Sequence, residues 1–283
     1  MRRATFHLFA FAIASAGCTG VVSEGPSVGD ADATTTTTAL VVVERTTDRG
    51  QSARAEASAR FVRVAAPTTT DDALRAIGAG VDLPPVGTCA SYASLTAGLP
   101  ALVAPQVELI RVGEVSVEAG DVATPLLPRQ LPDVTDVVSG VVYAKAADPA
   151  VLPTAAPYVV HVGGTTEIDA FDVSAQSPAD VSEVHVLGET AAGALRIGGR
   201  VVEFTWPADG AADPVFVDVM PSGVRCSLGE TGYASLPSVL LRDGGTITIH
   251  RLRRETFHAA GIASGEVRFD FARSIAYGAY TRR

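Results

Sequence analysis

The sequence contains no asparagine, and Lys145 is the single lysine among its 22 basic residues. The absence of asparagine excludes N-linked glycosylation and the Asn-Gly turns that often close β-hairpins. The 31 acidic residues leave a formal net charge of -9, and no long basic segment is present. Because nucleic-acid binding depends on clustered lysine and arginine, we predict no nucleic-acid partner.

The motifs of common enzymes and metalloproteins are absent as well. The sequence has no G-x-S-x-G, no Walker A loop, no H-E-x-x-H and no EF-hand loop. His161 and His185 fall in segments expected to be strands, where they could meet across a sheet, but a metal site needs at least one further ligand and the spacing supplies none. We therefore predict no catalytic residue, no cofactor and no metal site.

The N-terminal segment has the pattern of a bacterial export signal. Arg2 and Arg3 precede an apolar run, Ala4–Ala16, that is too short to span a bilayer. Two processing sites are consistent with this pattern. Ser15–Cys18 resembles a lipoprotein box, which is cleaved before the cysteine and carries diacylglycerol on its sulfur. Ala14–Ala16 instead fits ordinary signal peptidase, which would cleave after the second alanine.

The segment after Cys18 favours the lipoprotein interpretation. Residues 18–38 are rich in small polar residues and include a run of five threonines. Such a segment cannot bury enough apolar surface to fold, so we predict a disordered tether. Residues 1–17 are then the signal peptide, and the mature protein is an outer-membrane or cell-surface lipoprotein anchored in the membrane by Cys18. The alternative is a periplasmic or secreted protein.

Cys89 and Cys226 are the two cysteines that remain. Export places them in an oxidising compartment, where a pair of cysteines forms a disulfide more often than a metal or redox site. We therefore expect a bridge between them. The alternative is two separate buried thiols that act as small apolar side chains.

The rest of the chain is predicted to be mainly β. Apolar residues make up 47% of the sequence, which is enough for a packed core. Between Ala53 and Val64 apolar residues alternate with polar ones, and this period of two is typical of a strand with one buried face. Asp71–Ile77 is the clearest helix, with acidic residues in its first turn and Gly78 after it. Short strands between turns indicate an antiparallel, Ig-like β-sandwich with one or two short helices.

Prolines divide the expected strands. Residues 146–157 contain three prolines and many alanines, so we predict a boundary there. It would separate an N-terminal β sub-domain, residues 39–145, from a C-terminal Ig-like sandwich, residues 158–283. Pro125 and Pro128 lack the N–H group that a central strand must donate, so we expect their segment to be excluded from the middle of a sheet.

Part of the chain resembles a known group of proteins. Val215–Leu241, preceded by EFTWPADG, is similar to the C-terminal half of uncharacterised exported lipoproteins of myxobacterial type. In that group a strand ending in tryptophan precedes another strand, a lone cysteine, a turn with glycine and an I-P…L-L segment; Cys226, Gly232 and Leu236-Pro237 match these places. ELIRVGEVSVEAGD and YVVHVGGTTEIDAFDVSAQSP also look like strands of the group. The resemblance implies a β-sandwich surface lipoprotein and transfers no catalytic residue.

Arg251, Arg253 and Arg254 form the densest local group of cations. Arginine matches the geometry of phosphate groups, so these residues are candidate contacts for anionic lipid headgroups, lipopolysaccharide or a polyanionic glycan. The alternative is the solvated face of an edge strand, where alternating charges discourage aggregation.

Three functions are consistent with these features. The first, which we expect, is a non-enzymatic binding or structural module on the cell envelope, with a glycan or protein as partner. The second is a secreted carbohydrate-active hydrolase, which needs two carboxyl groups about 5–10 Å apart in one cleft. The third is a subunit of an envelope assembly whose free strand edge pairs with a partner. The candidate carboxyl groups for the hydrolase are those of Asp169, Asp172, Asp218 and Glu230.

Overall fold

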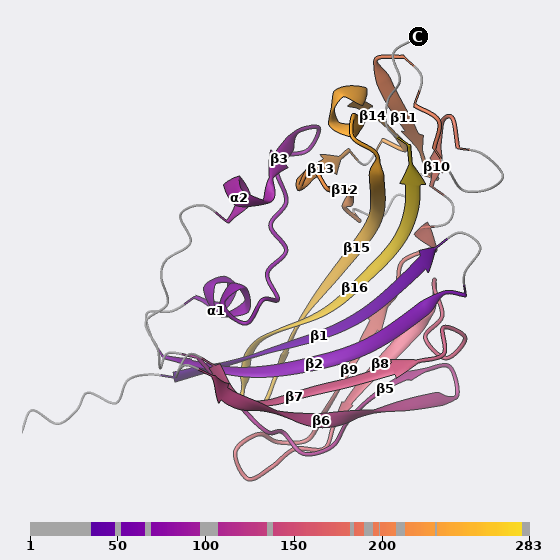
Figure 1. Cartoon of the computed structure of the whole chain (residues 1–283). Helices are drawn as coiled ribbons and strands as arrows, with labels where there is room; N and C mark the ends of the chain where they lie inside the picture. Colours follow the sequence, from indigo (N-terminus) through magenta and orange to yellow (C-terminus); the bar gives the residue numbers. More distant parts are fainter. Residues whose placement is uncertain are drawn as a thin grey trace, which may run out of the picture. The chain divides into compact units, whose positions relative to one another are not determined.

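β-strands dominate the structure (Figure 1), which confirms the prediction of a mainly β fold. The computed structural model describes residues 35–48, 52–65, 69–96, 107–134, 138–181, 184–189, 195–197, 199–207, 213–229 and 231–278. The strands are β1 (Thr35–Asp48), β2 (Arg54–Ala65), β3 (Cys89–Ser91), β4 (Val107–Leu109), β5 (Val115–Ala119), β6 (Val122–Val134), β7 (Val138–Ala147), β8 (Pro157–Val162), β9 (Phe171–Gln176), β10 (His185–Val186), β11 (Val201–Thr205), β12 (Val215–Met220), β13 (Val224–Leu228), β14 (Tyr233–Pro237), β15 (Gly245–Ala259) and β16 (Ile262–Tyr277).

Most of these strands share one sheet, in the order β3-β13-β12-β15-β16-β1-β2-β4-β7-β6-β5-β8-β9. Most neighbours are antiparallel, but β1 and β16 are parallel, with Thr38 opposite Ser264 and Asp48 opposite Ser274. The first and last strands of this sheet along the chain therefore lie side by side. The described residues from Thr35 onward form one compact unit. The predicted boundary at residues 146–157 thus connects β7 and β8 of one sheet and does not separate two sub-domains.

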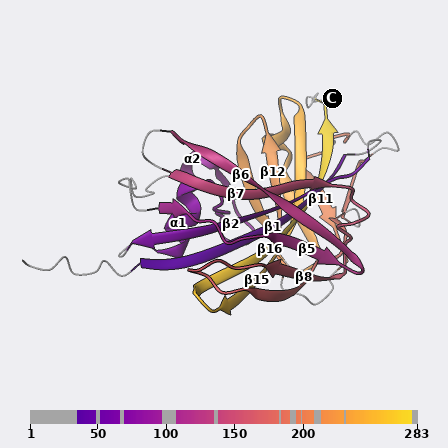
Figure 2. The same ribbon diagram turned by 90° about the horizontal axis from the view of Figure 1, so that it is seen from below.

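The sheet folds over so that two parts of it enclose a common core, which gives the fold a sandwich-like arrangement. Tyr158 on β8 packs against Phe269 on β16 with ring centroids 5.0 Å apart. Val41 on β1 and Val117 on β5 belong to the same buried cluster. Figure 2 shows β5 and β8 together with β1 and β16 from below. Burial of large apolar side chains from both parts supplies the main stabilisation of this arrangement.

The alternation predicted for β2 is present. Ala55, Ala57, Ala59 and Phe61 are all buried in the core, whereas Glu56 between them is exposed. Successive residues of a strand point to opposite faces, so the period of two places one face of β2 in the core. On the opposite face Ser58, Val62 and Val64 are buried as well.

Residues 69–96, which we call the strap, begin on the other face of the sheet and reach its edge, where β3 pairs with β13. The strap contains α1 (Thr70–Ala76), β3 and α2 (Tyr92–Leu95). The predicted helix is confirmed: the hydroxyl of Thr69 caps α1 by accepting a hydrogen bond from the backbone N–H of Asp72. Leu74 of α1 packs on Leu40 and Val42 of β1. No helix among the described residues is long and apolar enough to cross a membrane.

A smaller sheet of three strands, in the order β10-β11-β14, precedes the 3-10 helix η2 (Ser238–Leu241). Phe204 and Leu236 on its inner face are buried. On its outer side Leu187 is 68% exposed and Val201 is 46% exposed. These two residues serve below as controls for the exposed apolar residues of β6.

Residues 125–132 belong to the sheet, but the prolines do not occupy positions that pair on both edges. β6 pairs with β5 through residues 122–126 and with β7 through residues 127–134, so each position has a neighbour on one edge only. The two-residue turn Gly120-Asp121, with Gly120 at φ 60, makes Ala119 and Val122 a hydrogen-bonded pair. The N–H groups of successive residues in a strand point to opposite edges. The positions at which Pro125 and Pro128 lack an N–H group therefore face the open edge of β6, so no hydrogen bond between strands is lost.

The predicted tether ends earlier than expected. Thr35–Thr38 belong to β1, and Thr38 is buried, with its hydroxyl donating a 2.7 Å hydrogen bond to the carbonyl of Ser264. Threonine is β-branched and therefore favours strands when a neighbouring strand is available. Residues 18–34, the signal peptide and Cys18 lie outside the described residues.

Candidate functional site

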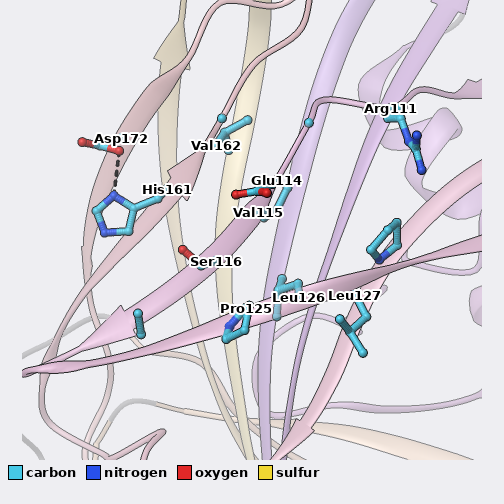
Figure 3. A pocket seen from close by; sticks show the side chains of 14 residues that line it. Arg111, Glu114, Val115, Ser116, Pro125, Leu126, Leu127, His161, Val162 and Asp172 are labelled. Carbon is cyan, nitrogen blue, oxygen red and sulfur yellow. Dashed lines mark hydrogen bonds and ion pairs between the residues drawn. The ribbon is translucent and has the colours of Figure 1, made fainter.

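A groove, which we call the β6 groove, opens where the β5–β6 hairpin separates. Before Val115 the chain leaves the hairpin toward β4, whereas β6 continues past Leu126 to pair with β7. The groove between them has a volume of about 970 Å³ and a mostly apolar lining, shown in Figure 3. Its lining residues are Arg111, Gly113, Glu114, Val115, Ser116, Ala123, Pro125, Leu126, Leu127, Pro128, His161, Val162, Gly163 and Asp172.

One wall of the groove is formed by β6. Pro125, Leu127 and Pro128 line it, and Leu127 is 53% exposed. Val122 and Leu131 on the same strand are also exposed, so β6 presents several large apolar side chains to solvent. Exposed apolar surface beside a groove is typical of a binding site. Because Pro128 has no N–H group, the open edge of β6 is also a poor template for another strand.

The opposite wall depends on a close approach of two backbone segments. Gly113 has φ 84, and a Cβ atom there would lie 2.3 Å from the carbonyl oxygen of Gly164. Only glycine permits both this conformation and this approach. Arg111 and Glu114 lie on either side of Gly113 and are exposed, and their side chains form no hydrogen bond or ion pair with any residue that the structure describes. Both charged groups are therefore available to a ligand.

A row of polar side chains from three strands lies at one end of the groove. Ser116 on β5 is opposite His161 on β8, and His161 is opposite Asp172 on β9. Directly opposite residues project from the same face of a sheet, so all three side chains line the groove. His161 Nδ1 lies 2.8 Å from Asp172 Oδ1, and its Nε2 lies 3.1 Å from Glu118 Oε2.

These two contacts determine the charge of His161. Neutral imidazole has one N–H group and can donate to one carboxylate, whereas imidazolium donates to both. The hydrogen bond with Asp172 raises the pKa of His161; partial burial opposes this, and the hydrogen bond with Glu118 raises the pKa further, so the net direction is upward. The ring is therefore held in its charged form at pH values where an isolated histidine is largely neutral.

Ser116, His161 and Asp172 have the residue types of a serine hydrolase triad but not its geometry. In a triad, the second ring nitrogen of the histidine is free to accept the proton of the serine hydroxyl. Here Nε2 faces Glu118, and a charged ring has no lone pair to accept a proton. The arrangement connects β5, β8 and β9 and does not activate a nucleophile.

The four carboxyl groups considered for a hydrolase do not come together. Asp172 lines the groove, whereas Asp169 is exposed and is not part of the lining. Asp218 is buried on β12 and receives two hydrogen bonds from Arg225, of 2.7 and 2.8 Å. Glu230 lies outside the described residues. No two of the three described residues of this set line the groove together, so they do not form the carboxylate pair that glycoside hydrolysis needs.

Arg251, Arg253 and Arg254 do not share one open cationic patch, because Arg251 is buried whereas Arg254 is exposed. Arg251 continues the inward-facing series of Ile247 and Ile249 and is buried, with Nη1 3.4 Å from the carbonyl oxygen of Ala179. β12 pairs with β15 only through residues 246–251, so Arg253 and Arg254 are paired with β16 alone.

The other two arginines are bound to carboxylates of the chain itself. Arg253 Nε donates to Asp213 at 2.8 Å, and Arg254 donates to Glu266. The sequence pattern of alternating arginines did not reveal these partners, because Asp213 lies 40 positions away. Internal carboxylates therefore pair with two of the three arginines that were candidate contacts for an external anion.

The histidines do not form a metal site either. His161 lies on β8 of the large sheet and His185 on β10 of the small sheet, so they do not meet as expected. Among the described residues no three histidine, cysteine, aspartate or glutamate side chains are placed to hold a metal ion. Around His161 the two carboxylates lie at different ring nitrogens, where they do not face one common position.

Cys89 and Cys226 are joined in a disulfide. The two residues are directly opposite each other in the β3–β13 pair, so the bond attaches the strap to the large sheet. This bond is remote from the β6 groove in the order of the strands.

Comparisons with known proteins do not assign the chain to a family. No family model and no curated protein matches the sequence. Among solved structures, the chain is similar to the Mu homology domain of zebrafish (Danio rerio) Fcho1 with bound Eps15 peptide. That likeness has 9% sequence identity, covers 86% of this chain and 97% of the other, and has a TM-score of 0.26. At this TM-score the likeness carries no argument about fold or function.

Proposed function

We propose that the protein is a membrane-tethered, non-enzymatic ligand-binding module of the cell envelope and that the β6 groove is its binding site. The N-terminal export pattern, Cys18 and the polar segment after it support the location. The resemblance to exported lipoproteins supports it as well. The observation that carries the binding role is a groove of about 970 Å³ that is mostly apolar and lies beside the exposed Leu127.

The lining of the groove suggests the kind of ligand. Apolar side chains dominate it, its lining contains no phenylalanine, tyrosine or tryptophan, and Arg111 and Glu114 supply one charge of each sign. Such a site favours a ligand with an apolar body and few polar groups over a highly hydroxylated one. The position of Pro128 on the open edge makes pairing with an added strand less favourable than insertion of apolar groups into the groove.

We expect Leu127→Asp to weaken binding of an apolar probe to the groove. N-phenyl-1-naphthylamine is uncharged and fluoresces when it leaves water. Loss of one leucine contact together with introduction of a carboxylate is expected to weaken its binding by about tenfold or more. Leu187→Asp is the matched control, because Leu187 is even more exposed but lies directly after β10 of the small sheet. Equal loss of binding in both variants, or in neither, would contradict the assignment of the groove.

The anchor is tested separately by the intact mass of the protein purified from membranes of the native host. We expect a chain that begins at Cys18 and carries additional acyl mass. A chain that begins at Gly17 without lipid would show that the signal is removed by ordinary signal peptidase. In that case the location part of the proposal is wrong, while the binding role of the groove remains open to the probe experiment.

A further inference from the structure

His161 connects three neighbouring strands of the groove wall through one ring. The ring belongs to β8, its Nδ1 contacts Asp172 on β9, and its Nε2 contacts Glu118 on β5. Figure 3 shows the bond with Asp172 at the end of the groove. Only the protonated ring can donate to both carboxylates, so this geometry depends on one proton.

No other cation compensates these carboxylates. Among the described residues, His161 is the one basic group that forms a hydrogen bond or ion pair with Glu118 or Asp172. β6 contributes the uncharged Pro125 to this end of the groove, and the neighbours of His161 on β8, Val160 and Val162, face the core. Glu114 and Arg111 are the remaining charged residues of the lining. A change in the charge of this end of the groove near neutral pH therefore comes from the protonation of His161.

We propose that His161 is a proton-controlled latch that regulates ligand binding in the β6 groove. In the protonated state the ring ties β5 and β9 to β8. When the proton leaves, the ring keeps one N–H donor, one carboxylate loses its hydrogen bond, and the net charge of the three groups changes from -1 to -2. This inference rests on the proposed binding function of the groove, but the latch itself can be measured without a ligand.

Loss of the proton changes the groove in two ways. A lone pair of the neutral ring then faces the freed carboxylate, so that side chain rotates away into solvent, which it already contacts: the exposed side-chain fractions are 40% for Glu118 and 69% for Asp172. The end of the groove also becomes more polar and more negative. Both changes are expected to weaken binding of an apolar ligand as the pH rises through the titration of His161.

The first test is the NMR titration of the ring nitrogens of His161 in the full chain, in Glu118→Gln and in Asp172→Asn. We expect a midpoint above the ordinary value of about 6.5 and a lower midpoint in each variant, because each removes one neighbouring carboxylate. Glu114→Gln is the matched control: it changes a carboxylate of the same groove that does not contact the ring. A midpoint at or below the ordinary value, or one insensitive to both variants, overturns the latch.

The second test measures the affinity for N-phenyl-1-naphthylamine between pH 5.5 and 9. We expect affinity to fall with the midpoint of His161 in the wild type and to be independent of pH in His161→Gln. Binding that requires Leu127 but does not change with pH would overturn the latch and leave the proposed function intact. No binding at any pH would overturn the proposed function and, with it, the regulation of binding by His161.

Discussion

Reduction of the Cys89–Cys226 disulfide is expected to lower the free energy of unfolding by about 4–5 kcal/mol. The bond joins residues 137 positions apart, and a loop of that length removes much conformational entropy from the unfolded chain. This value is an upper one, since strain in the folded state subtracts from it. Urea unfolding with and without reductant measures the difference directly.

The double variant Cys89→Ala/Cys226→Ala is the control for the disulfide, because its unfolding should not respond to reductant. Reduction should also increase hydrogen exchange in the strap around β3, whose register with β13 places the two cysteines opposite each other. α1 should be less affected, since Leu74 packs on β1 independently of the bond. An unchanged urea midpoint after complete reduction would contradict this role of the bond.

Glu266→Gln is expected to destabilise the fold by about 3–5 kcal/mol, because it leaves a buried guanidinium without its carboxylate. Glu266 and Arg268 are both buried, and Arg268 Nε donates to Glu266 at 2.6 Å. Arg254 donates to the same carboxylate, and Arg268 Nη1 also donates to the carbonyl of Ala79 at 2.6 Å. The variant therefore weakens both the sheet and the attachment of the strap.

The effect of Glu266→Gln should depend on pH. Burial alone would raise the pKa of Glu266, but the hydrogen bonds from Arg254 and Arg268 outweigh it and lower the pKa. A lowered pKa stabilises the folded protein above the unfolded value of about 4.3, and this stability is lost as the pH falls through the folded pKa. The difference between wild type and variant should thus be full at pH 7 and shrink below pH 4.

Glu108→Gln is the matched control for Glu266→Gln. Glu108 also pairs with an arginine, Arg63, but its side chain is 57% exposed. An exposed ion pair contributes about 0–1 kcal/mol, so this variant should change stability little. Equal effects of the two variants in urea unfolding would show that burial of Glu266 is not the cause.

Local patterns in the sequence were sufficient to predict several elements. The alternation in β2 and the acidic start followed by Gly78 in α1 depend on residues a few positions apart. A single chain therefore displays them without knowledge of its fold. The mainly β class follows from the number of such short patterns.

Long-range pairing could not be predicted in this way. Thr38 bonds to Ser264 across 226 positions, and no local pattern specifies that β1 lies beside β16. The β6 groove arises from the same kind of information, because it exists only where β6 changes partner from β5 to β7. The prolines of β6 were the available signal, but their meaning depends on which edge of the strand is open.

The wrong expectation for Arg251 has a related cause. A run of arginines on a strand looks solvated when its partners are unknown, yet Arg251 shares the inward face of Ile247 and Ile249. His161 was recognised only as a strand histidine, because Glu118 is 43 positions away in the sequence. In both cases the charge of a site is decided by residues that only the sheet brings together.

The most direct test of the binding proposal is to locate the probe on the protein. In an NMR titration of the full chain with N-phenyl-1-naphthylamine at pH 6, we expect shift changes confined to residues 111–116, 123–128 and 161–163, which line the β6 groove. Changes centred instead on Leu187 and Val201 of the small sheet, or none at saturating probe, would contradict the proposal that the β6 groove is the binding site.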